Sequence, residues 1–138
     1  MITRIEALVD AFSRQNGFHD PSSVAYRNRN PLLLKAFSEK HERDKDGYRI
    51  FSSVASGYNN AINDLQVKLS GKSRCKLEPT NTLKDLVRFF GSDASATRSV
   101  KNFLRHALDD ENIYENTPLS FFLEDLSGKY GTANAQNN

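Results

Sequence analysis

The side chains most often used for metal binding and catalysis are scattered along this sequence. His19, His41 and His106 lack metal-ligand spacing with one another and with Cys75, the single cysteine. The adjacent serine pairs form no recognisable pattern with a base, and no glycine-rich phosphate loop is present. We therefore expect no metal site and no cofactor, and one cysteine allows no internal disulfide.

Basic residues provide a second kind of candidate site. Arg98, Lys101 and Arg105 are spaced by three and four residues, which places them on one face of a helix. Such a face suits contacts with phosphates, so a small helical nucleic-acid-binding protein is one hypothesis for the function. The alternative is an ordinary solvated helix face, because no helix-turn-helix pattern accompanies these residues.

The bulk composition favours an ordinary globular chain. The 138 residues are 38% hydrophobic and 10% aromatic, enough for a core, and the formal net charge is only +2. The N-terminus lacks the apolar run of a signal peptide, and no stretch is long and apolar enough to cross a membrane. We expect a soluble protein made in the cytoplasm, with no membrane partner.

Apolar residues recur at helical spacing in five segments, which must position any site. Thr3 with Glu6 predicts a capping box for the first helix, and Thr82 with Asp85 predicts one for the third. Thr117-Pro118 is typical of the start of the last helix. The predicted helices are 3–16, 54–69, 82–90, 100–108 and 118–127.

The stretch between the first two helices is irregular. Residues 18–37 break the helical pattern, residues 38–47 are almost entirely polar, and residues 48–51 resemble a short extended segment. The predicted fold class is therefore mainly α, or α+β with at most a short hairpin. We expect a single helical domain over residues 1–131 and a flexible C-terminal tail over residues 132–138.

The irregular stretch carries a resemblance to a known group of proteins. Asn16-Gly17-Phe18 is followed by Pro21-Ser22-Ser23-Val24-Ala25, then by Arg27-Asn28-Arg29-Asn30-Pro31, Gly47-Tyr48-Arg49-Ile50-Phe51 and Gly57-Tyr58. This order resembles small phage and prophage proteins with a lysozyme-like or lytic-transglycosylase-like domain, and the later helices are similar as well. The resemblance runs from Ile5 to Leu123. It implies a lysozyme-like helical fold and a cleft for peptidoglycan glycan.

The sequence departs from that group where catalysis is expected. The first helix of the group ends in a glutamic acid that protonates the glycosidic oxygen, and Asn16 takes its place. An amide has no proton to give at neutral pH. If hydrolysis survives, Asp20 is the candidate acid, with a carboxylate from the polar loop (Glu39, Glu42, Asp44 or Asp46) as its partner. The alternative is that Asp20 is a turn residue.

Recognition without hydrolysis is the other expectation. Asn16, Tyr26, Asn28 and Asn30 carry planar polar or aromatic groups of the kind that bind sugars, and they are our candidate ligand-binding residues. The asparagines equally suit a structural turn, in which side-chain amides satisfy the loop backbone. Leu32, Leu33 and Leu34 replace a polar part of the group's signature, and they fit either core burial or an apolar patch that docks a partner.

The sequence therefore favours a lysozyme-like domain of phage or prophage type that is degenerate at its catalytic position. We expect it to bind cell-wall glycan or to act as an interaction component of a virion or complex, so virion association is one expected location. The alternatives are the nucleic-acid-binding protein and a weakly active peptidoglycan glycosidase. Enzymatic activity is the less favoured outcome.

Overall fold

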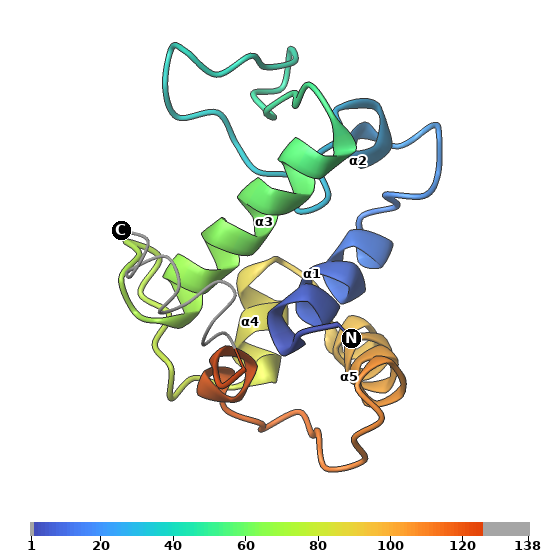
Figure 1. The fold of residues 1–138 in the computed structure, drawn as a ribbon, viewed down its shortest axis with the longest axis vertical. Helices are drawn as coiled ribbons and strands as arrows, with labels where there is room; N and C mark the ends of the chain where they lie inside the picture. Colours follow the sequence, from blue (N-terminus) through green and yellow to red (C-terminus); the bar gives the residue numbers. More distant parts are fainter. Residues whose placement is uncertain (1, 126–138) are drawn as a thin grey trace. The chain divides into compact units, whose positions relative to one another are not determined.

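The computed structural model describes residues 2–125, and this part of the chain is mainly helical, as predicted. Strand pairing within it is limited to isolated antiparallel bridges, Lys35 with Tyr48, Arg43 with Arg49 and Thr82 with Pro118, which form no sheet. None of its helices has the length and apolar run needed to cross a bilayer. The elements in chain order are α1 (Arg4–Gln15), α2 (Val24–Arg27), α3 (Val54–Leu69), α4 (Leu83–Phe89), α5 (Ala94–Ala107) and the 3-10 helix η1 (Leu119–Leu123) (Figure 1).

Side-chain caps determine where these helices begin. Before α1, Glu6 accepts a hydrogen bond from the Thr3 backbone N–H at 2.8 Å, and the Thr3 hydroxyl accepts one from the Glu6 N–H. Thr82 and Asp85 form the same reciprocal box at α4. Both boxes satisfy backbone donors that a helix start leaves without partners, which confirms the two predicted starts.

Three helices differ from the prediction. Helix α5 begins at Ala94 rather than at residue 100, because the Asp93 side chain caps it by accepting from the Ala96 backbone N–H. The short helix α2 lies inside the stretch predicted to be irregular, and the Ser23 side chain caps it by accepting from the Tyr26 backbone N–H. The last predicted helix is shorter, since only five residues after Pro118 form 3-10 turns. The end of the helix predicted over residues 118–127 and the predicted tail over residues 132–138 lie outside the described residues.

The chain forms two compact units, and it passes from one to the other within α1 and within α3. The first unit consists of residues 1–8 and 65–138, and the second of residues 9–64. A single helical domain over residues 1–131 stays a prediction.

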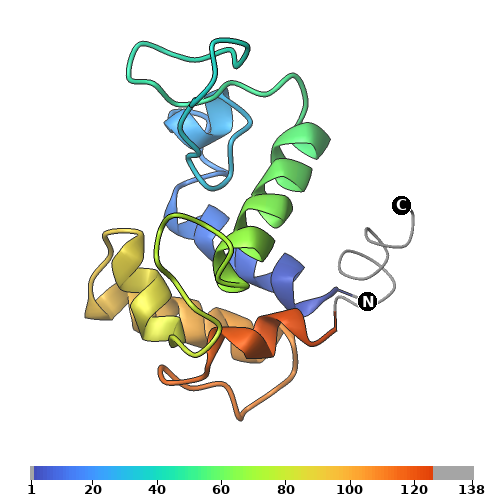
Figure 2. The same ribbon diagram turned by 90° about the vertical axis from the view of Figure 1, so that its left-hand side faces the viewer.

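In the first unit, α4 packs against α5, and η1 is attached to the start of α4 (Figure 2). The Leu119 backbone N–H donates to the Asn81 carbonyl oxygen at 2.8 Å, which joins the two segments directly. The core of this unit is aliphatic apart from one phenylalanine, and its largest fully buried side chains are Ile5, Leu8, Leu65, Leu69, Leu83, Leu86, Leu104, Ile113, Leu119 and Phe122.

In the second unit, the loop over residues 28–53 returns to the first turn of α3. The Arg29 carbonyl oxygen lies so close to Gly57 that a Cβ atom at this position would be 1.8 Å from it. Only glycine therefore permits this approach of the loop to α3. The core of this smaller unit contains Val9, Ala11, Phe12, Ala25, Leu32, Phe51, Ala61 and Ile62.

Candidate functional site

The end of α1 presents Asn16 where the resemblance places a catalytic acid. Gly17, with a φ of +74°, takes the chain out of the helix, and the Phe18 backbone N–H donates back to the Ser13 carbonyl oxygen. The Asn16 Nδ2 atom donates a 2.9 Å hydrogen bond to the Pro31 carbonyl oxygen. Asn16 thus connects the end of the helix to the irregular loop, and it lies half-buried.

Asp20 forms a turn with Ser22. Its Oδ1 atom accepts hydrogen bonds from the Ser22 backbone N–H at 3.0 Å and from the Ser22 hydroxyl at 2.8 Å. These two donors, the backbone one first, lower the pKa of Asp20 below its ordinary value. A glycosidase acid needs a raised pKa in a dry site, whereas Asp20 is exposed and ionised at neutral pH. These surroundings suit a turn residue better than a proton donor.

Asn28 and Asn30 are buried and hold the loop together. The Asn30 Nδ2 atom donates to the Leu34 and Arg49 carbonyl oxygens at 3.0 Å, and its Oδ1 atom accepts from the Leu34 backbone N–H at 2.9 Å. The Asn28 Nδ2 atom donates to Asp44 Oδ2 at 2.8 Å. These contacts occupy the amide groups that a ligand would otherwise use, so they fit the structural alternative.

Tyr26 is placed differently, because it lines a pocket with a volume of about 450 Å³ in the second unit. It lies on α2 and is 49% exposed. The walls of the pocket come from four nearby segments of the chain, namely the residues after α1, α2, the residue before Asn30 and the first residue of α3. They are Phe18, His19, Tyr26, Arg27, Arg29 and Val54. We call this the aromatic–arginine pocket.

The aromatic–arginine pocket contains one predicted ligand residue and brings in five that the sequence analysis did not select. Phe18 and His19 meet edge to face, with their ring centroids 5.8 Å apart. The sequence did contain a pattern that indicates Arg27. A serine after a proline turn is a typical helix N-cap, so Ser23 predicts the short helix α2, which ends at Arg27. Nothing local indicated that Val54 would join these residues, since it is distant in sequence.

The aliphatic run after Pro31 does not form an exposed patch. Leu32 is 4% exposed, and Leu33 and Leu34 are half-buried. Phe37 is different, because it is 84% exposed, and its ring meets the His41 ring edge to face with the centroids 4.5 Å apart. Core burial therefore describes Leu32, whereas Phe37 offers an isolated apolar side chain to the surroundings.

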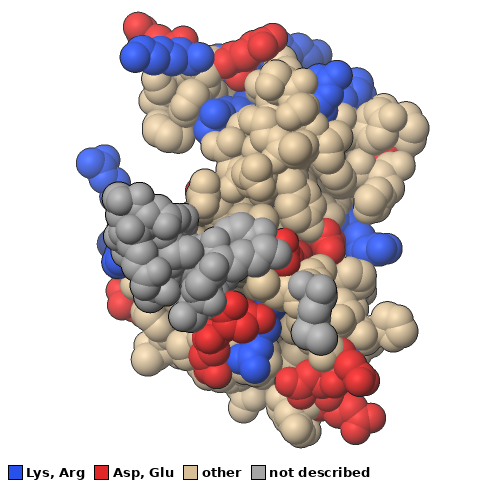
Figure 3. Space-filling view, viewed as in Figure 1, with Lys and Arg blue, Asp and Glu red and all other residues tan. Residues whose placement is uncertain are grey.

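The basic face of α5 is partly used within the first unit. The Arg105 Nε atom donates to the Ile113 carbonyl oxygen at 2.7 Å, and its guanidinium lies over the Tyr114 ring at 4.9 Å. Arg98 is exposed and Lys101 half-buried. Acidic side chains gather over the loop after α5, which contains Asp109, Asp110 and Glu111 (Figure 3). An acidic loop beside the basic face weakens its attraction for phosphates.

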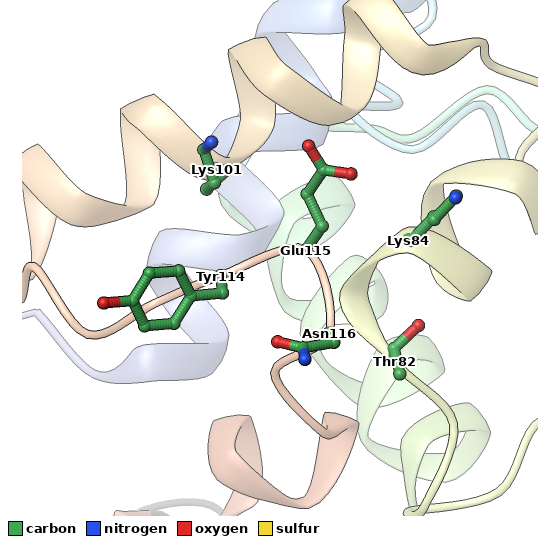
Figure 4. A pocket seen from close by; sticks show the side chains of 6 residues that line it. All are labelled: Thr82, Lys84, Lys101, Tyr114, Glu115 and Asn116. Carbon is green, nitrogen blue, oxygen red and sulfur yellow. The ribbon is translucent and has the colours of Figure 1, made fainter.

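Lys101 also lines a second pocket, of about 450 Å³, in the first unit. Figure 4 shows the Glu115 side chain directed into the space between Lys101 on α5 and Lys84 on α4. The Lys84 backbone N–H donates to the Glu115 carbonyl oxygen at 2.9 Å, which fixes this loop against α4. Glu115 offsets one of the two lysine charges, so the lining of this pocket carries less net positive charge than the aromatic–arginine pocket.

Within residues 2–125, no three His, Cys, Asp or Glu side chains come together in a way that would hold a metal ion. In comparisons with known proteins, no family model, curated protein or solved structure matches this chain.

Proposed function

We propose that this protein is a lysozyme-like domain of phage or prophage type that binds cell-wall glycan without cleaving it. The observation that carries the proposal is the aromatic–arginine pocket, with Tyr26 half-exposed on its wall. Concave sites with a few aromatic and polar side chains are the usual form of small-ligand sites. Phe18 and His19 on its wall lie two and three residues after Asn16, the position from which the resembled proteins would deliver their proton.

The surroundings of Asn16 and Asp20 support the absence of cleavage. The Asn16 amide is hydrogen-bonded to Pro31, and Asp20 is exposed with a lowered pKa. Neither side chain is suited to protonate a glycosidic oxygen at neutral pH. Binding therefore explains these residues better than residual hydrolysis does.

The test is a binding measurement with the purified chain. We expect it to co-sediment with insoluble peptidoglycan and to bind soluble glycan fragments in calorimetry, without releasing reducing sugar. Tyr26→Ala removes an aromatic wall of the pocket and should lower the affinity by about tenfold. No co-sedimentation would contradict the proposal.

A matched control is available in the first unit. Tyr114 is 51% exposed, nearly the same as the 49% of Tyr26, but it does not line the aromatic–arginine pocket. Tyr114→Ala should leave glycan binding unchanged. An equal loss in both variants would mean that binding does not occur at the proposed pocket.

Docking in a virion or complex is the second candidate, and the exposure of Phe37 favours it. An exposed aromatic side chain such as Phe37 is the type of residue that anchors protein–protein interfaces. Phage particles produced with the chain or with Phe37→Ser can be compared by mass spectrometry. Loss of the variant from the particles, with unchanged glycan binding, would identify this second role.

A further inference from the structure

We infer that the aromatic–arginine pocket selects a sugar that bears a free carboxylate over a neutral sugar. The inference rests on the proposed function and names the chemistry that the pocket would recognise. Arg27 and Arg29 both line this pocket, and none of the six lining residues is acidic. The wall therefore carries two uncompensated positive charges beside aromatic rings.

Backbone carbonyl groups, rather than carboxylates, position these two arginines. The Arg27 Nη1 atom donates to the Ser22 carbonyl oxygen at 2.6 Å, and the Arg29 Nη1 atom donates to the Phe51 carbonyl oxygen at 3.3 Å. Over the described residues 2–125, neither guanidinium has a carboxylate within ion-pair distance. Each one keeps its charge and most of its N–H donors for a ligand.

The backbone of Arg29 has a left-handed conformation that fixes its position in the loop. Its φ of +52° is uncommon for a residue with a long side chain. The adjacent contact explains how this conformation is held, because the Arg29 carbonyl oxygen packs closely against Gly57. The loop is thereby fixed with Arg29 on the wall of the pocket, two residues from Arg27.

The chemistry of the ligand follows from this wall. A planar guanidinium pairs with a carboxylate through two parallel hydrogen bonds, and Arg is better suited to this than Lys. The Tyr26 and Phe18 rings offer apolar faces to a sugar ring. In cell-wall glycan, the muramic acid carboxyl is free only after an amide hydrolysis has removed its peptide. The pocket would therefore bind the product of that class of reaction.

The first experiment compares three probes with the unchanged protein. They are a tetrasaccharide of alternating N-acetylglucosamine and N-acetylmuramic acid without peptides, a neutral N-acetylglucosamine tetrasaccharide, and the first glycan with its peptides attached. The acidic glycan without peptides should bind at least about tenfold more tightly than the neutral one. Its affinity should fall as salt is raised, whereas the affinity for the neutral glycan should stay the same.

The outcomes separate the inference from the proposed function. Equal affinity for acidic and neutral glycans overturns the carboxylate preference but leaves glycan binding intact. Tightest binding of the peptide-bearing glycan also overturns it, because the recognised carboxylates are then those of the peptide. Binding of none of the probes contradicts the proposed function itself, and with it the inference.

The second experiment uses variants of the arginines. Arg27→Gln and Arg29→Gln should each lower the affinity for the acidic glycan about tenfold and leave that for the neutral glycan unchanged. Arg29→Lys should restore part of the loss, since it keeps the charge without the planar fork. The matched control is Arg98→Gln, an exposed arginine on α5 that should have no effect. A loss that is equal for both glycans would indicate a merely structural role and overturn the inference.

Discussion

The amide of the buried Asn28 donates a 2.8 Å hydrogen bond to the carboxylate of Asp44, and this contact connects the end of α2 to the tip of the polar loop. The other Asp44 oxygen accepts from the Asp46 and Tyr48 backbone N–H groups. A single carboxylate thus organises the turn over residues 44–48. That turn leads into residues 48–51, and the Phe51 carbonyl oxygen accepts a hydrogen bond from Arg29 Nη1. The turn therefore helps to position the Arg29 side chain.

Removal of the Asn28 amide should weaken the second unit. Asn28→Ala deletes a buried donor, and we expect the free energy of unfolding to fall by about 1 kcal/mol. Asn59→Ala is the matched control, because Asn59 is an exposed asparagine on α3 without side-chain partners among residues 2–125. Chemical denaturation of both variants measures the difference. Equal stabilities would show that the Asn28–Asp44 contact is not formed in solution.

The same contact predicts a pH dependence of stability. The Asn28 amide, followed by the backbone N–H groups of residues 46–48, lowers the pKa of Asp44 below its ordinary value of 3.8. A lowered pKa means that ionised Asp44 favours the folded state at pH values above the unfolded pKa, and that this contribution is lost as the pH falls through the folded pKa. Thermal unfolding between pH 6 and pH 2, about the range in which carboxyl groups titrate, measures it. The chain should lose more stability than Asp44→Asn over this range, and parallel curves would contradict the prediction.

Gly57→Ala should reverse the usual effect of this substitution. Alanine ordinarily stabilises a helix by about 0.5–1 kcal/mol relative to glycine. At Gly57 the added Cβ atom would meet the Arg29 carbonyl oxygen at 1.8 Å, so we expect a loss of about 1–3 kcal/mol instead. The neighbouring variant Ser56→Ala should change the stability by less than about 0.5 kcal/mol. A Gly57→Ala variant as stable as the natural chain would show that the loop does not approach α3 this closely.

Arg105 should contribute to stability more than Arg98 does. Arg105→Ala removes the hydrogen bond to Ile113 and the contact with Tyr114, at an expected cost of about 1–2 kcal/mol. Arg98→Ala should cost less than about 0.5 kcal/mol, since this side chain is exposed on α5. Denaturation curves of the two variants provide the comparison. Equal losses would mean that the loop after α5 does not depend on Arg105.

Retention of the protein on immobilised DNA tests the hypothesis that it binds nucleic acid. We expect little retention at about 0.15 M salt, where charges more than about 8 Å apart are largely screened. Strong, salt-sensitive retention that falls in both Arg98→Ala and Lys101→Ala would instead favour nucleic-acid binding. These two residues are the informative ones, because Arg105 also supports the adjacent loop.

Sequence patterns predict those parts of the fold that depend on near neighbours. The Thr82–Asp85 box lies within four residues, so α4 can be located from the sequence alone. In contrast, η1 takes its first hydrogen bonds from the Asn81 and Pro79 carbonyl oxygens, which lie far away in the sequence. The spacing of apolar residues gives no information on hydrogen-bond partners that are distant in the sequence, and this explains why a longer helix was predicted there.

The candidate site shows the same limit. Tyr26 was selected for its residue type and lies on the pocket, whereas Asn30 was selected for the same reason and is completely buried. The difference comes from the Leu34 and Arg49 carbonyl oxygens, which occupy the Asn30 amide. A list of residue types cannot distinguish a sugar-binding amide from one that holds a loop together. That distinction requires the folded loop.

The position of Asn16 allows the lysozyme-like resemblance to be tested by a gain of function. In Asn16→Glu, the new carboxyl would lie near the Pro31 carbonyl oxygen, which accepts a hydrogen bond from the present amide. Only a protonated carboxyl can donate to that oxygen, so this contact would raise its pKa, as a general acid requires. We expect the natural chain to leave a peptidoglycan suspension turbid and Asn16→Glu to clear it slowly, faster at mildly acidic pH, where more of such a raised group is protonated.

Two control variants test whether the new carboxyl at position 16 is the acid. Asn16→Gln keeps an amide and should show no clearing. Asp20→Asn, made together with Asn16→Glu, should not reduce the gain, because Asp20 is ionised in its turn with Ser22 and donates no proton. Clearing by the natural chain that Asp20→Asn abolishes would reverse this interpretation, and it would make Asp20 the surviving acid of an active glycosidase.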